Sequence, residues 1–160
     1  MHSGSDKFSL YGPIRRVLKK YDAGVHIKTA GTTWLEEVIG LATAGGNGLA
    51  IAKQIYRTAM VRFDELCGPY AAVVDINKAA LPCPDAVDKW NGDEYAAALR
   101  HEPSCGRYDP NFRQVIHIGY KIAAEMGQTY LEALDKYEDI IAGNVRKNIL
   151  ERHIKPLFLE

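Results

Sequence analysis

The amino-acid sequence predicts a mostly α-helical protein with one or two short β-strands. The strand prediction rests on residues 25–28, where apolar and polar side chains alternate as they do in a half-buried strand. The helix prediction rests on the rest of the chain, where apolar residues recur every three or four positions between glycine and proline breaks. With 160 residues, 47% of them hydrophobic and 25% charged, the chain is long enough for one domain with a real core.

The composition gives no reason to expect a nucleic-acid or membrane partner. The 20 basic residues balance the 20 acidic residues, and no apolar run approaches the length of a membrane span. The first residues lack the apolar stretch of a signal peptide. Cys67, Cys83 and Cys105 lack the spacing of a metal site, and their odd number favours reduced thiols. We therefore expect a cytoplasmic protein.

The first elements are predicted to alternate between helix and strand. Residues 8–21 are expected to contain a turn at Gly12-Pro13 and then a helix with Pro13 at its first position. The strand at residues 25–28 follows, and then a second helix. Thr33 and Glu36 have the spacing of a capping box for the start of that helix.

The rest of the chain is predicted to be helical. Asp109 is expected to cap a helix that runs to Met126, with Pro110 as its first residue. Further helices are expected over residues 49–67, 85–90, 93–101, 129–141 and 144–153.

Two polar clusters, residues 2–7 and 28–33, stand where a strand would hand over to a helix. In alternating β/α folds this end of the strands carries the chemistry. Free N–H groups and the positive end of a helix also favour a bound carboxylate or phosphate there. The alternative, a plain strand–turn–helix with solvated polar residues, fits the spacing equally well.

Three stretches of the chain resemble the tagaturonate epimerase family. They are Gly4-Ser5-Asp6-Lys7-Phe8-Ser9, His26-Ile27-Lys28-Thr29-Ala30-Gly31-Thr32-Thr33-Trp34-Leu35-Glu36, and Asn111-Phe112-Arg113-Gln114-Val115-Ile116-His117-Ile118-Gly119-Tyr120-Lys121. The resemblance covers nearly the whole chain, but only the last third of the family's usual length. It implies a C-terminal fragment or a truncated gene product. Residues 1–44 would be the last strand–loop–helix units of a (β/α) TIM-like barrel, and residues 45–160 a helical C-terminal extension.

The resemblance also implies a reaction, the interconversion of D-tagaturonate and D-fructuronate with the help of a divalent cation. These keto-hexuronates differ at a carbinol carbon that is not next to the ketone, so simple enolisation cannot invert it. Our hypothesis is retro-aldol cleavage and re-addition, with a metal stabilising the enediolate. The rival route, transient oxidation, needs a redox cofactor, and the sequence has no dinucleotide-binding fingerprint.

Candidate site residues follow from the resemblance and from the strand positions. The metal-ligand candidates are His2 and His26, since neutral imidazole suits Zn, Ni, Co, Fe or Mn; further ligands are expected from upstream sequence. The catalytic candidates are Asp6, Lys7 and Lys28, with Asp6 as the general base or acid. The substrate-binding candidates are Ser3, Ser5, Thr29, Gly31, Thr32, Thr33, Arg113, His117 and Lys121.

Each candidate has a structural alternative. His26 can be a hydrogen-bonded interior histidine, Asp6 a turn former, the lysines surface residues and the threonines helix caps. Spacing alone favours a solvent-facing stripe for Arg113, His117 and Lys121, which lie four residues apart.

Two functions therefore remain open. The first is part of a metal-dependent hexuronate epimerase, inactive as an isolated fragment, with a small keto-hexuronate as its partner. The second is a non-catalytic helical interaction module, which the helical excess after residue 45 supports. An unpaired strand edge would also favour self-association of the fragment.

Overall fold

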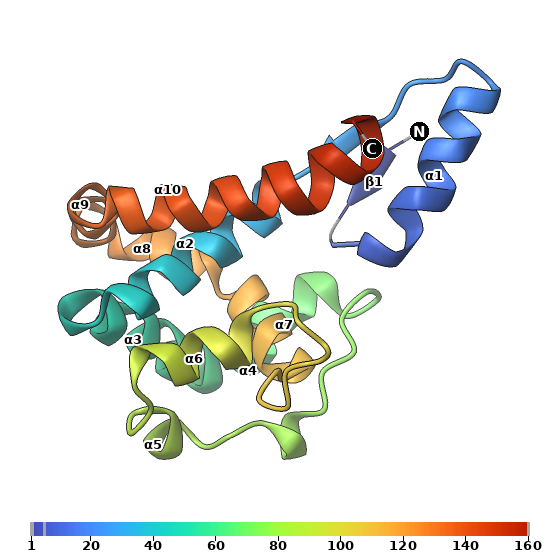
Figure 1. Cartoon of the computed structure of the whole chain (residues 1–160). Helices are drawn as coiled ribbons and strands as arrows, with labels where there is room; N and C mark the ends of the chain where they lie inside the picture. The colour runs from blue at the N-terminus through green and yellow to red at the C-terminus, as the bar shows by residue number, and fades with distance from the viewer. Residues whose placement is uncertain (1, 5, 160) are drawn as a thin grey trace.

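The computed structural model describes residues 2–4 and 6–159. Two short strands, β1 (His2–Gly4) and β2 (His26–Lys28), pair in parallel, with His2 opposite His26 and Gly4 opposite Lys28. Helix α1 (Phe8–Lys20) forms the crossover between them, as a parallel pair requires. Figure 1 shows this β1–α1–β2 unit at one end of the molecule, beside both chain termini.

Helix α2 (Ala30–Ala44) is the centre of the helical body. It makes its most extensive contacts with α10 (Glu138–Arg146), α3 (Gly46–Val61) and α6 (Gly92–Leu99). Its apolar side chains are buried on nearly every side, as expected for a helix surrounded by others. Gly40 allows the close approach of α10, because a Cβ there would lie 2.6 Å from Ile141 Cγ1.

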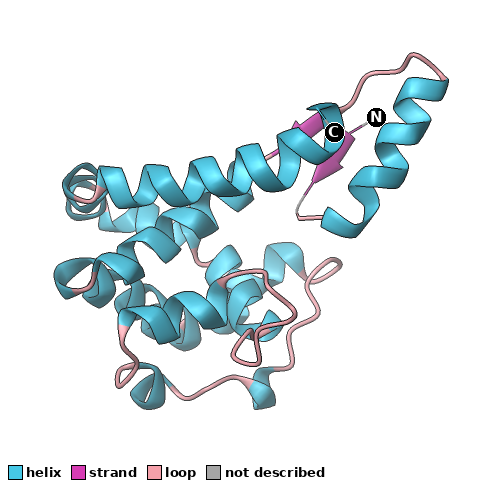
Figure 2. Cartoon of the chain, viewed as in Figure 1, coloured by secondary structure: helices cyan, strands magenta, loops and turns pink. Residues whose placement is uncertain are grey.

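The remaining elements are short helices that wrap this core (Figure 2). They are α4 (Phe63–Cys67), η1 (Gly68–Tyr70), η2 (Lys78–Ala80), α5 (Pro84–Val87), α7 (Pro110–Ile118), α8 (Tyr120–Met126), α9 (Gln128–Lys136) and the π-helical segment η3 (Lys147–Leu159).

The C-terminal segment returns to the start of the chain. Figure 1 shows α10 and η3 running as one long helical rod, and the end of this rod lies beside α1. Phe8 and Tyr11 of α1 pack against the ring of His153 at centroid distances of 5.2 Å and 5.4 Å. Tyr11 and His153 are almost completely buried, so α1 is anchored mainly by η3.

The structure confirms a mostly helical chain with two short strands. It contains no barrel among the described residues, and the barrel origin of residues 1–44 stays a prediction. The Asp109 cap is confirmed, because Asp109 Oδ1 accepts hydrogen bonds from the N–H groups of Asn111 (2.8 Å) and Phe112 (3.0 Å). No helix in the described ranges is both long enough and apolar enough to cross a membrane.

Several predicted boundaries are wrong. Helix α1 starts before Pro13, which lies inside it, and α2 starts at Ala30, so Thr33 and Glu36 do not form a capping box. Glu36 is instead buried and accepts a hydrogen bond from Asn148. The helix predicted to run to Met126 is interrupted at Gly119, where α7 ends.

Candidate functional site

A cavity of about 350 Å³ opens where β1 and β2 end and α2 begins, and we call it the Asp6 cavity. It brings together segments that are far apart in the sequence. Six predicted site residues line it: Asp6, Lys28, Gly31, Thr32, Arg113 and His117. Residues that sequence reasoning did not single out also line it, among them His101, Tyr108 and Gln114.

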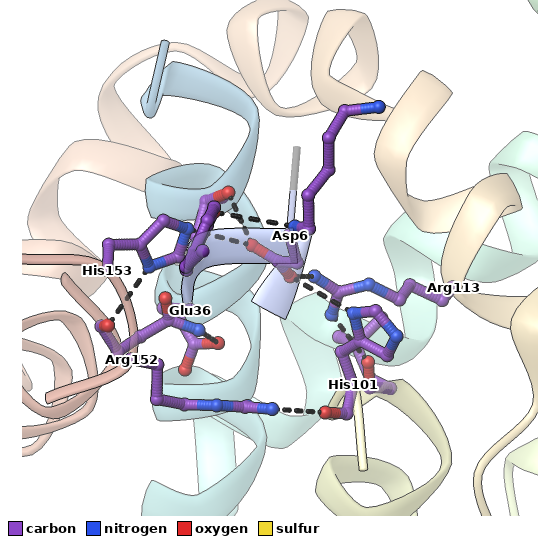
Figure 3. Close-up of polar contacts among 11 residues, drawn as sticks. Asp6, Glu36, His101, Arg113, Arg152 and His153 are labelled. Carbon is purple, nitrogen blue, oxygen red and sulfur yellow. Dashed lines mark hydrogen bonds and ion pairs between the residues drawn. The ribbon is translucent and has the colours of Figure 1, made fainter. Parts of the chain in front are cut away.

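Asp6 is the polar centre of this region (Figure 3). Its carboxylate is 3% exposed and accepts hydrogen bonds from Thr32 Oγ1 at 2.9 Å and from Arg113 Nη2 at 2.5 Å. His101 Nδ1 lies 3.6 Å from one carboxylate oxygen, and His153 Nε2 lies 3.3 Å from the other. One side chain therefore joins the exit of β1 to α2, to α7, to the 101–109 loop and to η3.

These partners fix the charge of Asp6. Burial alone would raise the pKa of its carboxyl group, but hydrogen bonds from His101 and His153, the charge of Arg113 and the Thr32 hydroxyl group together hold that pKa far below its ordinary value. Asp6 is thus ionised across the physiological range and is a weak base. Its geometry favours positioning of its neighbours over the proton transfer predicted for it.

The start of α2 gives the cavity an anion-binding edge. Thr29 occupies the N-cap position without a side-chain hydrogen bond, and the first intrahelical bond runs from Thr33 N–H to Thr29 C=O. The preceding N–H groups of the first turn have no helical acceptor, and Gly31 and Thr32 line the cavity. Lys28, exposed at the cavity rim, forms no ion pair with any residue that the structure describes. A carboxylate would meet both the positive helix end and this ammonium group.

His117, on α7, lies directly against this edge. Its ring approaches Gly31 so closely that a Cβ at Gly31 would overlap His117 Nε2. Partial desolvation, with a smaller contribution from the charge of Arg113, lowers the pKa of His117. A neutral imidazole at neutral pH can accept a proton from a bound hydroxyl group.

Other predicted site residues lie elsewhere. Lys121 is on α8, where it pairs with Glu65 at 2.8 Å, so the predicted stripe of Arg113, His117 and Lys121 is divided by the helix break at Gly119. Lys7, Thr29 and Thr33 do not line the Asp6 cavity. Ser5 and the side chain of Ser3 lie outside what the structure describes.

The predicted metal ligands, His2 and His26, are the first residues of β1 and β2. His26 is exposed on β2, and the backbone register sets it beside His2, whose side chain lies outside the described part of the chain. Among the described residues, no group of three His, Cys, Asp or Glu side chains is placed to hold a metal ion.

Long-range contacts explain why His101, Tyr108 and His153 were missed. His101 and Tyr108 belong to a loop, where their rings stack at 5.5 Å, and His153 lies in the last helical segment. The one sequence signal was a His and a Tyr within a short polar loop just before the Asp109 cap. Only the fold brings that loop to Asp6.

The cavity lies at the exit of a parallel βα unit and is lined by hydroxyl, imidazole and cationic side chains. A sequence model of tagaturonate epimerase matches residues 1–157, so the chain belongs to the tagaturonate epimerase family. The chain is 28% identical over 158 residues to the tagaturonate/fructuronate epimerase of Thermotoga maritima. That match covers 96% of this chain and 28% of the relative, so the chain spans less than a third of that protein's length. No solved structure matches the chain.

Proposed function

We propose that this chain forms part of the substrate site of a hexuronate epimerase that interconverts D-tagaturonate and D-fructuronate. The observation that carries the proposal is the Asp6 cavity, which gathers residues from both strand exits, α2 and α7. Family membership and the activity in the name of the Thermotoga maritima relative support the choice of substrate. The parallel β1–α1–β2 unit supports an origin as the last units of a β/α barrel.

In this proposal the substrate carboxylate binds at Lys28 and the first turn of α2. Both groups are positive. Lys28 forms no ion pair with a described residue, and the first turn of α2 contains no acidic residue of its own, while the Asp6 carboxylate accepts a hydrogen bond from the Thr32 side chain there. Arg113 is held differently, because its guanidinium group already donates to Asp6 and to the Leu99 carbonyl oxygen (2.8 Å). Arg113 and Asp6 therefore orient the cavity wall, and Lys28 makes the direct contact.

His117 is the proposed proton acceptor. In the retro-aldol route it takes the proton of the hydroxyl group on the carbon to be inverted. The adjacent C–C bond then breaks to leave an aldehyde and an enediolate. Rotation of the aldehyde, re-formation of the bond and return of the proton give the epimer. Because the pKa of His117 is lowered, its neutral form is available at neutral pH.

We also propose a bound divalent cation, a cytoplasmic location and self-association of the chain. A divalent cation would need ligands beyond the described residues, with His26 and His2 as this chain's contribution. A cytoplasmic location follows from the substrate class, and self-association follows from the edge of the two-stranded sheet. For the metal, calorimetric titration with Mn²⁺ or Ni²⁺ should give binding that His26→Ala abolishes; titration without heat would remove the cation from the proposal.

The substrate proposal is tested by calorimetric titration of the chain with D-fructuronate and D-tagaturonate. Lys28→Ala should weaken binding by about ten-fold or more, because a charge-assisted contact is lost. Lys7→Ala is the matched control: Lys7 is also exposed and lies near a strand exit, but it does not line the cavity. Equal affinities of both variants, or no binding by the unaltered chain, would overturn the proposal and favour a non-catalytic interaction module.

A further inference from the structure

A second cavity, of about 310 Å³, lies between α6, α10, η3 and the loop after α6, and we call it the Asn148 cavity. Three cationic side chains line it, Arg100, Lys147 and Arg152. None of the three forms an ion pair with any residue that the structure describes. The arginines Arg57, Arg62, Arg107 and Arg113 are by contrast each paired with a carboxylate.

The contacts of these cations are to uncharged groups. Arg100 donates to Asn144 Oδ1 at 3.0 Å, and Arg152 donates to the His101 carbonyl oxygen at 2.7 Å (Figure 3). Arg152 also stacks on the ring of Phe8, at 3.8 Å from its centroid. Lys147 has no polar partner among the described residues. Both guanidinium groups are thus held in place with N–H groups to spare, as a carboxylate-binding site needs.

Asn148, which also lines the cavity, provides a hydrogen-bond acceptor in addition to the cationic donors. Asn148 is 3% exposed, and its Oδ1 is buried with no hydrogen-bond partner in the described structure. Its orientation is set, because its Nδ2 donates to Glu36 Oε1 at 2.7 Å and a flipped amide would place two oxygens together. A buried acceptor without a donor is costly, and a ligand hydroxyl group placed there would satisfy it.

The charge balance decides which donor fits. The acidic groups of the cavity are Glu36 and Glu102, and Glu102 already accepts a hydrogen bond from Ser104. The three cations therefore outweigh the acids, which disfavours an ammonium ligand and favours neutral hydroxyl donors.

We propose that the Asn148 cavity is a second ligand site that binds a small hydroxylated carboxylate, with its carboxylate on Lys147, Arg100 and Arg152 and a hydroxyl group on Asn148 Oδ1. This site is separate from the Asp6 cavity, and the proposal does not rest on epimerase activity. The two cavities are neighbours, because Arg152 binds the backbone of His101, a residue of the Asp6 cavity.

The test is calorimetric titration of the chain with D-gluconate, together with amide chemical-shift mapping. Gluconate should shift the side-chain amide signals of Asn144 and Asn148. Sorbitol, which lacks the carboxylate, and hexanoate, which lacks the hydroxyl groups, should each bind at least about ten-fold more weakly. Equal binding of either analogue would overturn the assigned ligand class.

A pair of variants separates the site from general surface charge. Lys147→Gln should weaken gluconate binding by about ten-fold, because an exposed ammonium group is lost without disturbing the core. Arg146→Gln, the matched control, removes a neighbouring exposed cation that does not line the cavity and should change affinity by less than about two-fold. Equal effects, or shifts confined to Gly31 and Gln114 of the Asp6 cavity, would overturn the second site while leaving the epimerase proposal untouched.

Discussion

Removal of the Asp6 carboxylate should cost the protein a large part of its stability. In Asp6→Ala, Arg113 would keep a charge that is only 11% exposed and would lose its ion-pair partner. Thr32 and His153 would lose an acceptor as well. Breaking a buried pair by removing one partner costs about 3–5 kcal/mol, against a typical total of about 5–15 kcal/mol for a domain. We expect a loss of about 3–5 kcal/mol in the free energy of unfolding.

Urea unfolding followed by far-ultraviolet circular dichroism at neutral pH measures this loss. Asp135→Asn is a suitable control, because Asp135 is exposed on α9 and has no described partner; its effect should stay within about 0.5 kcal/mol. The slope of free energy against urea should be similar for the two proteins if Asp6→Ala unfolds in one transition.

The pH dependence gives an independent check. The pKa of Asp6 is lower in the folded protein than in the unfolded chain, where it is about 3.9. The contribution of Asp6 to stability is therefore fully present above about pH 5. It is lost as the pH falls through the pKa of Asp6 in the unfolded chain towards its pKa in the folded protein. The difference in the free energy of unfolding between the original chain and Asp6→Ala should therefore become smaller on acidification. A loss of less than about 1 kcal/mol in the free energy of unfolding at neutral pH would refute the central role of Asp6. A difference between the two proteins that becomes larger in acid would refute it as well.

Two glycines give further predictions. Gly40→Ala should destabilise the protein by about 1–3 kcal/mol in urea unfolding, because the new Cβ would lie 2.9 Å from the backbone Cα of Ile141. The control is Gly143→Ala on α10, where a Cβ has nothing within 4 Å, and it should be neutral or stabilising. Equal effects of the two substitutions would contradict the close packing of α2 on α10. Gly31→Ala should leave the free energy of unfolding nearly unchanged but weaken D-fructuronate binding in calorimetry, because the new methyl group forces the His117 ring aside. An unaltered affinity for D-fructuronate would exclude His117 from the site.

Local signals predicted the elements that local chemistry determines. Asp109 and Pro110 start α7 because a side-chain cap and a fixed φ act within one turn. Thr33 and Glu36 have an equally good local pattern, but Glu36 is buried against Asn148, which is 112 residues away. Tertiary packing outweighed the cap, and the helix began earlier.

The site was predictable where it lies on the strand exits and hidden where it depends on the fold. Lys28 is the last residue of β2, and Gly31 and Thr32 follow soon after it, so the strand pattern was enough to find them. The partners of Asp6 include Arg113, 107 residues further along the chain, and His153 on η3. Neither pairing leaves a trace in spacing or composition, because Arg113 reaches Asp6 only when α7 packs beside α2, and His153 only when η3 packs against α1.

Amide chemical-shift mapping of D-fructuronate on the isotopically labelled chain tests the central claim most directly. At about millimolar ligand, the account predicts that the largest shifts fall on Gly31, Thr32 and Gln114, which surround the Asp6 cavity. Shifts that fall outside this cavity, or no shifts at all, would contradict the assignment of this cavity as the hexuronate site.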